Sequence, residues 1–352
     1  MISFTKTFKV LSVIAFSSVL FLMSCGMKNP TRNEAPDLFG IYTSTLDGKN
    51  MKMIVSDSYR EINHARVSPD NKWITFTRFN LRGPNGLAEE KHVLYGKTEI
   101  MIIRTDGTGL ESLTPPRRGI VAANSYWTPD SKGVIFISND NPKRQKELHY
   151  ISLATRKIRR VPTPKNILPG DPHQVGDWIV FPTFDFKGEK NVIWIMKADG
   201  EEARQLTRPI VPKAPKKQKQ TVGNWQYGDF DPKISPDGTK VAFWRHVPGG
   251  QLNWHTFIID IKTGEEIDLS PKNTFDGMPE WSSDGKLLIF YHIDPKNIRK
   301  MGLYTIKSDG NERKKISLPK GYLYSQPSFF PGEGSGEKTR IIFSAKKVPQ
   351  LK

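Results

Sequence analysis

The sequence predicts an all-β fold assembled from small antiparallel sheets, on three observations. A phrase in which a Ser-Pro-Asp-type turn precedes an apolar run recurs along the chain. A second phrase, an apolar run followed by Asp-Gly or Thr-Gly, alternates with the first. The 352 residues include 26 prolines and 28 glycines, which suits many turns and short strands better than long helices.

The first 24 residues are predicted to be a secretory signal peptide. Lys6 and Lys9 precede an apolar run, Val10 to Met23, that is short for a membrane span. The run leads into Leu-Met-Ser-Cys25, which resembles the lipobox of bacterial lipoproteins and implies cleavage before Cys25 and lipid on its thiol. Cys25 is the only cysteine, so no disulfide can form within the exported chain. The alternative is a signal peptide with an incidental cysteine.

The formal net charge of +17 favours anionic partners. Residues 1–24 contain Lys6, Lys9 and no acid, so their removal leaves 17 − 2 = +15. Lipid head groups and acidic polysaccharides fit such a surface, and export argues against nucleic acid. A surface that is only well solvated is the alternative reading.

The first phrase sets the repeat. It occurs as VSPDNKWITFTR, WTPDSKGVIFIS, ISPDGTKVAFWR and WSSDGKLLIFYH, with a Phe six residues after each turn Asp. Two further positions fit with altered turns. The aligned residues are Phe76, Phe136, Phe181, Phe243, Phe290 and Phe343, with successive gaps of 60, 45, 62, 47 and 53. A period of about 50 residues is typical of propellers and other repeat arrays.

The second phrase supplies another hairpin to each repeat. It occurs as TEIMIIRTDGTGLESLT, NVIWIMKADGEEARQLT, WHTFIIDIKTGEEIDLS and MGLYTIKSDGNERKKIS, with KELHYISLATRKIRRVP as a degenerate copy. Asp-Gly and Thr-Gly supply the positive φ that a short hairpin turn needs. Two hairpins give four antiparallel strands per repeat.

The two ends of the chain complete one another. Residues 37–55 read as strand-turn-strand with no preceding partner, and residues 322–345 lack a following hairpin. We therefore predict a six-bladed β-propeller over residues 37–352, with four-stranded antiparallel blades, closed by the N-terminal hairpin pairing with the C-terminal blade. Such closure leaves no unpaired edge between the ends. Residues 25–36 are the predicted tether, and the disc is expected to be monomeric.

The phrases resemble the WD-like propeller repeats of the TolB family over roughly residues 37–345. TolB carries an α/β domain before its propeller and has no lipid, whereas here only about a dozen residues separate Cys25 from the first predicted strand. By analogy the resemblance implies a periplasmic envelope protein and docking to the peptidoglycan-associated lipoprotein. Gly26 stands where enteric bacteria use Asp to retain lipoproteins at the inner membrane, so the outer membrane is favoured.

One candidate site lies six residues before each turn Asp, near the start of each innermost strand. Innermost strands line the channel of a propeller, so polar residues there are expected to meet at its mouth. They could bind a divalent metal or perform acid–base chemistry, or they could simply be solvated rim residues. The candidate channel-mouth residues are His64, Asn124, Asp231, His173 at the comparable point of the third blade, and the nearby Asp229 and Asp276, with Met278 in the fifth blade.

A second candidate site is the longer of two predicted loops, 207–230; the other spans 80–97. Its lysines could meet an anionic polymer, and its aromatics could stack on a sugar ring or anchor a peptide. The alternative is a solvated tract whose aromatics fix the loop to the disc. The candidate loop residues are Lys213, Lys216, Lys217, Lys219, Trp225 and Tyr227.

The predicted function is a lipid-anchored envelope scaffold that binds a protein or an anionic cell-wall polymer, without cofactor or chemistry of its own. The alternative is a metal-dependent lyase or hydrolase acting on an acidic polysaccharide, in the manner of oligogalacturonide lyases, with His64 and His173 as ligands or base. A serine peptidase is excluded because the sequence has no G-x-S-x-G elbow. Sialidase boxes need a residue between Asp and Gly, and here Asp237-Gly238 and Asp284-Gly285 are adjacent.

Overall fold

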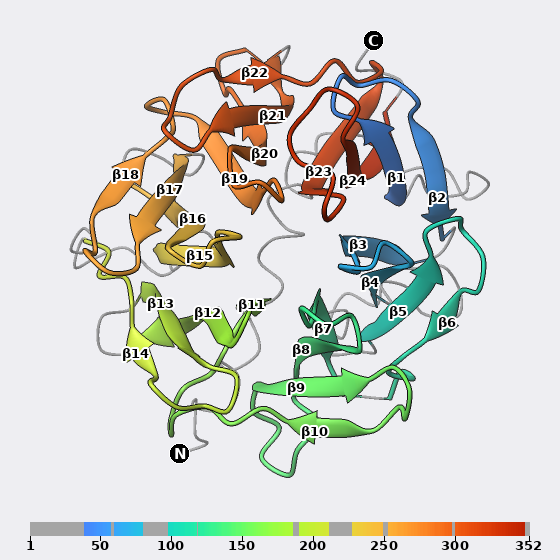
Figure 1. Cartoon of the computed structure of the whole chain (residues 1–352), viewed down its shortest axis with the longest axis vertical. Helices are drawn as coiled ribbons and strands as arrows, with labels where there is room; N and C mark the ends of the chain where they lie inside the picture. Colours follow the sequence, from blue (N-terminus) through green and yellow to red (C-terminus); the bar gives the residue numbers. More distant parts are fainter. Residues whose placement is uncertain are drawn as a thin grey trace, which may run out of the picture.

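The computed structural model describes residues 39–57, 60–79, 98–117, 119–185, 190–210, 227–248, 253–297 and 300–348. These residues contain 24 strands and no α-helix, which confirms the all-β prediction. No helix in this part of the chain has the length and apolar character needed to cross a bilayer. Figure 1 shows the strands in small sheets around a central axis, with β3, β7, β11, β15, β19 and β23 nearest the centre.

The strands follow one another in antiparallel groups of four. They are β1 (Gly40–Thr45), β2 (Lys52–Ser56), β3 (Glu61–Val67), β4 (Trp73–Phe79), β5 (Thr98–Arg104), β6 (Glu111–Ser112), β7 (Ala122–Trp127), β8 (Gly133–Ser138), β9 (Glu147–Ser152), β10 (Ile158–Arg160), β11 (His173–Val175), β12 (Trp178–Asp185), β13 (Lys190–Lys197), β14 (Arg204–Gln205), β15 (Gly228–Ile234), β16 (Lys240–His246), β17 (Trp254–Asp260), β18 (Glu266–Asp268), β19 (Phe275–Trp281), β20 (Leu287–Ile293), β21 (Gly302–Lys307), β22 (Lys314–Lys315), β23 (Tyr322–Phe329) and β24 (Arg340–Lys347).

The first and last described strands share a sheet. β1 pairs antiparallel with β24 from Gly40↔Ala345 to Thr45↔Arg340, giving the order β2-β1-β24-β23. The β3–β6 and β7–β10 groups are separate sheets. The β11–β14, β15–β18 and β19–β22 groups are linked only by single parallel bridges, Asn191↔Gly228 and Trp254↔Phe275. Each group is therefore a small sheet of its own.

The turn Asp shapes the hairpin that follows each innermost strand. Asp70 Oδ1 accepts hydrogen bonds from Ser68 Oγ at 2.6 Å and from the Lys72 N–H at 3.2 Å. The next residue adopts positive φ, 58° at Asn71 and 74° at Gly238. Such side-chain acceptance mimics a backbone turn and stabilises it locally.

Backbone hydrogen bonds place two turns of every group on one face of the disc. In each group the turn between the third and fourth strands donates to the turn between the first and second. We call this the turn face, and the opposite side, with the connections between groups and between second and third strands, the connection face. The six bonds run from Leu46 N to Thr339 O, Thr105 N to Lys72 O, Leu153 N to Lys132 O, Ala198 N to Asp177 O, Ile261 N to Thr239 O and Ser308 N to Lys286 O.

The repeated Phe of the first phrase forms the core between neighbouring groups. All six are at most 1% exposed: Phe76, Phe136, Phe181, Phe243, Phe290 and Phe343. Each core cluster combines strands of adjacent groups; Ile41 and Ile342, for example, pack with Ile74 and Phe76. Full burial of such a side chain contributes about 1.5–3 kcal/mol.

The innermost strands carry a repeated β-bulge. The register with the second strand shifts between Asn63 and Arg66 in β3, and at the same point in β7, β15, β19 and β23. A bulge reverses which side chains face which side of the sheet. The bulged residues have positive φ: His64 (57°), Asn124 (55°), Asp231 (46°), Met278 (59°) and Gln326 (51°).

Candidate functional site

The innermost strands direct two layers of side chains towards the central axis. The first layer contains the bulged residues, and the second contains the residue two positions further along each strand. The β11 group contributes Asp171, six residues before Asp177, to the first layer, and His173 to the second. The first layer is His64, Asn124, Asp171, Asp231, Met278 and Gln326; the second is Arg66, Tyr126, His173, Lys233, Glu280 and Ser328.

The predicted place of His173 is therefore corrected. Asp171 occupies the first-layer position, and His173 lies one layer deeper, 3% exposed. β11 is short and has no bulge, so its alternation differs from that of the other innermost strands. A usable signal was present, because Asp171-Pro-His173 matches Asp231-Pro-Lys233 in the next repeat.

The first layer joins neighbouring groups. The His64 backbone N–H donates to Gln326 Oε1 at 2.7 Å, and His64 Nδ1 lies 2.7 Å from Asn63 Oδ1. Asn124 Nδ2 donates to Asp171, while the buried Asn124 Oδ1 has no protein partner among the described residues. The His64–Gln326 and Asn124–Asp171 contacts thus join different groups, whereas Asn63 contacts the His64 ring within one strand.

The second layer is centred on Glu280. Its Oε2 lies 3.3 Å from Arg66 Nε, and its Oε1 accepts from Tyr126 Oη at 3.3 Å and lies 3.8 Å from His173 Nε2. Lys233 forms a buried ion pair with Asp231. One carboxylate therefore joins strands β3, β7 and β11 to β19 across the axis.

Both histidines are held neutral. Burial, with help from the Arg66 and Lys233 charges, lowers the pKa of His64 to about 3. Burial and the same two cations hold the pKa of His173 well below its usual value. His173 Nδ1 accepts from the Ile234 N–H at 3.1 Å, so its proton resides on Nε2, facing Glu280. At neutral pH these rings are uncharged hydrogen-bonding groups.

The channel carboxyls have divergent pKa values. Burial raises the pKa of Glu280, although Arg66 and Lys233 oppose the rise. Burial and the neighbouring Asp231 charge raise the pKa of Asp171. Asp231 is also buried, but Lys233 and Arg66 outweigh that effect and lower its pKa. Asp231 is thus the carboxylate that Lys233 keeps ionised.

Asp229 and Asp276 do not join this cluster, which corrects their predicted position near the channel mouth. Arg245 donates to both oxygens of Asp229, at 2.5 and 3.1 Å. Arg313 donates to both oxygens of Asp276, at 2.7 and 2.9 Å, and His292 Nδ1 lies 2.6 Å from the same carboxylate. The bulge is the reason. It separates Asp229 from the channel-facing Asp231 and leaves Asp229 opposite its strand partner Arg245.

Most of the predicted loop site lies outside the described residues, as does Cys25. This applies to Lys213, Lys216, Lys217, Lys219 and Trp225. Tyr227 is described, and its ring stacks on His246 at 5.1 Å and 13°, while Trp254 also stacks on His246 at 4.6 Å. One face of Tyr227 is therefore already covered by the protein.

Within the described ranges, no three His, Cys, Asp or Glu side chains converge as a candidate metal site. In the channel, Asp231 and Glu280 are instead engaged by Lys233 and Arg66. The contacts of Asp231 and Glu280 are therefore explained by their cationic neighbours within the protein.

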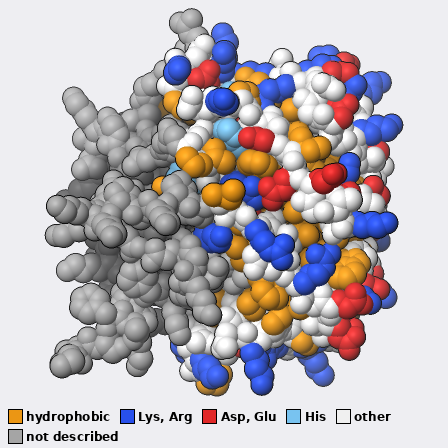
Figure 2. Space-filling view, turned by 90° about the vertical axis from the view of Figure 1, so that its left-hand side faces the viewer, with side chains coloured by type: hydrophobic (Ala, Val, Ile, Leu, Met, Phe, Trp, Pro, Cys, Tyr) orange, Lys and Arg blue, Asp and Glu red, His pale blue; other side chains and the backbone are white. Residues whose placement is uncertain are grey.

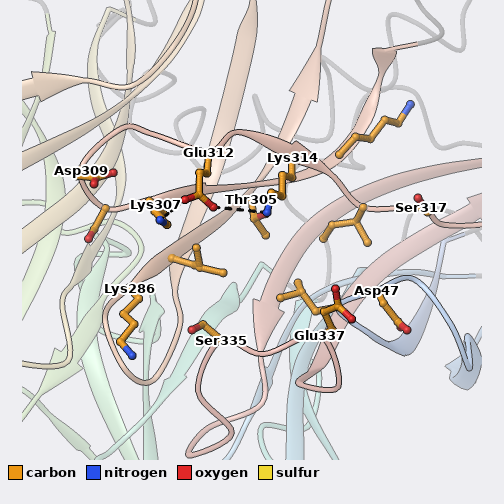
Figure 3. A pocket seen from close by; sticks show the side chains of 15 residues that line it. Asp47, Lys286, Thr305, Lys307, Asp309, Glu312, Lys314, Ser317, Ser335 and Glu337 are labelled. Atoms are coloured by element: carbon orange, nitrogen blue, oxygen red, sulfur yellow. Dashed lines mark hydrogen bonds and ion pairs between the residues drawn. The ribbon is translucent and has the colours of Figure 1, made fainter.

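A cavity of about 600 Å³ opens on the turn face. It lies between the β19–β22 group and the sheet that combines β1 with β24 (Figure 3). Leu46, Leu287 and Ile316 supply apolar surface. Its charged lining residues are Lys286, Lys307, Lys314, Lys315, Asp47, Asp309, Glu312 and Glu337.

No family model matches the sequence. Two solved structures resemble the chain over most of its length. TolB from Acinetobacter baumannii is 16% identical, with a TM-score of 0.55, covering 95% of this chain and 69% of that one. A putative TolB from Agrobacterium tumefaciens is 11% identical, with a TM-score of 0.58, covering 88% and 98%. The chain has a TolB-like β-propeller fold.

A curated relative matches a shorter part of the chain. The uncharacterized peptidase YuxL of Bacillus subtilis is 28% identical over 118 residues, which are 32% of this chain and 17% of that protein. The matched region therefore spans only a small part of YuxL, and propellers host many functions.

Proposed function

We propose that this chain is a lipid-anchored, six-bladed propeller of the cell envelope that binds a protein or an anionic cell-wall polymer without chemistry of its own. The six groups of four strands supply the blades. The β1–β24 pairing supplies the closure, since it brings both ends of the described chain into one blade.

The observation that carries the scaffold role is the compensation of charge within the channel. Arg66 is paired with Glu280, Lys233 with Asp231, and both histidines are neutral. A catalytic acid or base needs a free reacting position and a pKa near the working pH. Glu280 contacts Arg66, Tyr126 and His173 on three other blades, so we assign these side chains to holding the disc together.

The anchor rests on the sequence around Cys25. We propose cleavage before Cys25, lipid on its thiol, a periplasmic location and attachment to the outer membrane. Globomycin, which blocks lipoprotein signal peptidase, and Cys25→Ser should each leave uncleaved precursor, with no diacylglycerol mass on the chain. Normal processing in either case would contradict the anchor.

A binding and cleavage assay with an acidic polysaccharide distinguishes the scaffold proposal from the lyase alternative. The purified protein should retain polygalacturonate without shortening it, read by co-sedimentation and by absorbance of unsaturated products. Product that accumulates with the wild type and disappears in a His64→Ala, His173→Ala variant would favour the lyase. Bound metal lost from the same double variant would point the same way.

A further inference from the structure

The two faces of the disc differ in how many of their exposed cations are offset by carboxylates. On the turn face, three of the repeated turns have a lysine two residues after the turn Asp. Lys72 Nζ lies 3.5 Å from Asp70, and Lys286 Nζ lies 3.8 Å from Asp284. Further cation–carboxylate pairs on this face are Lys49–Asp47, Lys132–Asp130, Lys197–Glu202, Lys307–Glu312, Lys314–Glu312 and Arg340–Glu333.

On the connection face, some exposed cations have such partners, but several others have none. The described acids at its surface are already engaged: Asp140 with Arg117 and Arg144, and Asp294 with Lys300. The following residues are exposed and form no ion pair within the described part of the chain: Lys143, Lys165, Arg208, Lys272, Lys296, Lys320 and Lys347. They come from connections of different groups, so the excess positive charge is spread over the face.

In Figure 2, acidic and basic side chains are interspersed along the right-hand margin of the view, away from the undescribed atoms. Interspersed charges cancel within about a Debye length, roughly 8–10 Å, whereas uncompensated cations spread over one face sum to a field. The turn face also has exposed cations outside ion pairs, but exposed acids that are equally outside ion pairs offset them: Arg104, Lys157, Lys262 and Lys338 against Asp106, Asp199, Glu201, Glu265, Asp309 and Glu337. Among the described residues, the turn face is thus close to neutral and the connection face is positive.

The chain also enters the disc on the positive face. β1 ends at Thr45 beside the turn face, where Leu46 N donates to Thr339 O, so Gly40 marks the opposite end. Gly40 pairs with Ala345, two residues before Lys347. The fifteen peptide units between Cys25 and Gly40 reach at most roughly 50 Å when extended. A lipid on Cys25 would therefore hold this face within reach of the bilayer.

We propose that the connection face lies against an anionic membrane surface, with its free lysines on lipid phosphates. This inference rests on the proposed anchor for the tether and on the described cations for the orientation. Ile210, 92% exposed beside Arg208, adds an apolar group that suits a head-group layer better than a polysaccharide. The turn face and its 600 Å³ cavity then point away from the membrane, open to a partner.

Orientation is measured with a matched pair of labels. Lys296 on the connection face and Lys262 on the turn face each follow an Asp by two residues, and each donates its backbone N–H to that Asp at 2.9 Å. Lys296→Cys and Lys262→Cys are labelled with a fluorophore in the lipidated protein, on vesicles carrying a head-group quencher. We expect stronger quenching at 296 in vesicles with about one-third phosphatidylglycerol, and a smaller difference in phosphatidylcholine alone.

Charge reversal tests whether the connection-face lysines cause this orientation. Lys272→Glu, Lys320→Glu and Lys347→Glu together should abolish the difference between the two labels. The control, Lys132→Glu, Lys262→Glu and Lys286→Glu, makes the same change in net charge on the turn face and should preserve the preference, read with the label at 296. Equal quenching of the two wild-type labels, or a difference indifferent to phosphatidylglycerol, would overturn the proposal.

The unlipidated Cys25→Ser chain separates this inference from the anchor. It should co-sediment with phosphatidylglycerol vesicles at least about tenfold more tightly than with phosphatidylcholine vesicles, and the connection-face reversal should remove that preference. If the chain with Cys25 carries no lipid but the preference for phosphatidylglycerol persists, only the anchor is refuted. A face that binds free polygalacturonate but not phosphatidylglycerol would be a polymer site, and the membrane proposal would be wrong.

Discussion

Arg66 and Glu280 form a buried ion pair across the central axis, with Arg66 Nε 3.3 Å from Glu280 Oε2 and side chains 6% and 5% exposed. The pair joins β3 to β19, whose groups are separated in the disc by the sheet that contains β23 and β24. Removing one member leaves the other charge buried without compensation, which costs more than the net stabilisation of the pair.

Glu280→Ala is expected to lower the free energy of unfolding by about 3–5 kcal/mol, because Arg66 would be left buried and unpaired. The measurement is urea unfolding followed by tryptophan fluorescence. The double variant Arg66→Met, Glu280→Leu should lose clearly less unfolding free energy than the sum of the losses in Arg66→Met alone and Glu280→Leu alone. Additive losses would show that the two side chains do not interact.

Acid should destabilise the protein through its neutral channel histidines. The folded pKa of His173 is below the unfolded value of about 6.5, so between these values the unfolded state binds more protons. Its stabilising contribution is present above pH 6.5 and is lost as the pH falls. In His173→Gln, the slope of unfolding free energy against pH below pH 6 should be shallower, by at most about 1.4 kcal/mol per pH unit, the limit for one proton. An unchanged slope would mean that His173 titrates normally in the folded protein.

The pairing of the chain ends can be tested with a disulfide. Thr45 and Arg340 are opposite residues of β1 and β24 near the turn face. In a Cys25→Ser background, Thr45→Cys with Arg340→Cys should cross-link under oxidation and raise the unfolding midpoint, because the bridge closes a very long loop. Thr45→Cys with Lys347→Cys, at the far end of β24, should remain unlinked. Failure of the first pair alongside linkage of the second would refute the observed register.

Asp229 should prove structural. Asp229→Asn removes the charge that Arg245 meets with two hydrogen bonds in a fully buried position, and should cost about 2–4 kcal/mol of unfolding free energy. Retention of polygalacturonate by the folded variant should equal that of the wild type in co-sedimentation. If the variant loses polygalacturonate binding while its stability is unchanged, Asp229 belongs to the binding site.

The all-β class and the strand groups could be predicted because their causes are local. An Asp that accepts backbone N–H bonds, a glycine with positive φ and a Phe at a constant offset each act over a few residues, so repetition made them readable. His64, Asn124 and Asp231 were found on the same principle, since each lies a constant distance before a turn. The anchor at Cys25 and the loop lysines were also proposed from sequence, but they lie outside the described residues.

Tertiary structure alone decided which polar residues share the channel. Period-2 alternation would place Asp229 and Asp231 on the same side of the sheet, yet the bulge directs them to different sides. Asp229 therefore pairs with Arg245, and Asp231 pairs with Lys233. Nothing local marks Glu280 as the centre of the second layer, because its partners Arg66, Tyr126 and His173 come from three other groups. The sequence by itself determined the all-β class and the local hairpins. The arrangement of the sheets about the central axis determined which charges neutralise one another, because that depends on distances across the axis that no short stretch of sequence encodes.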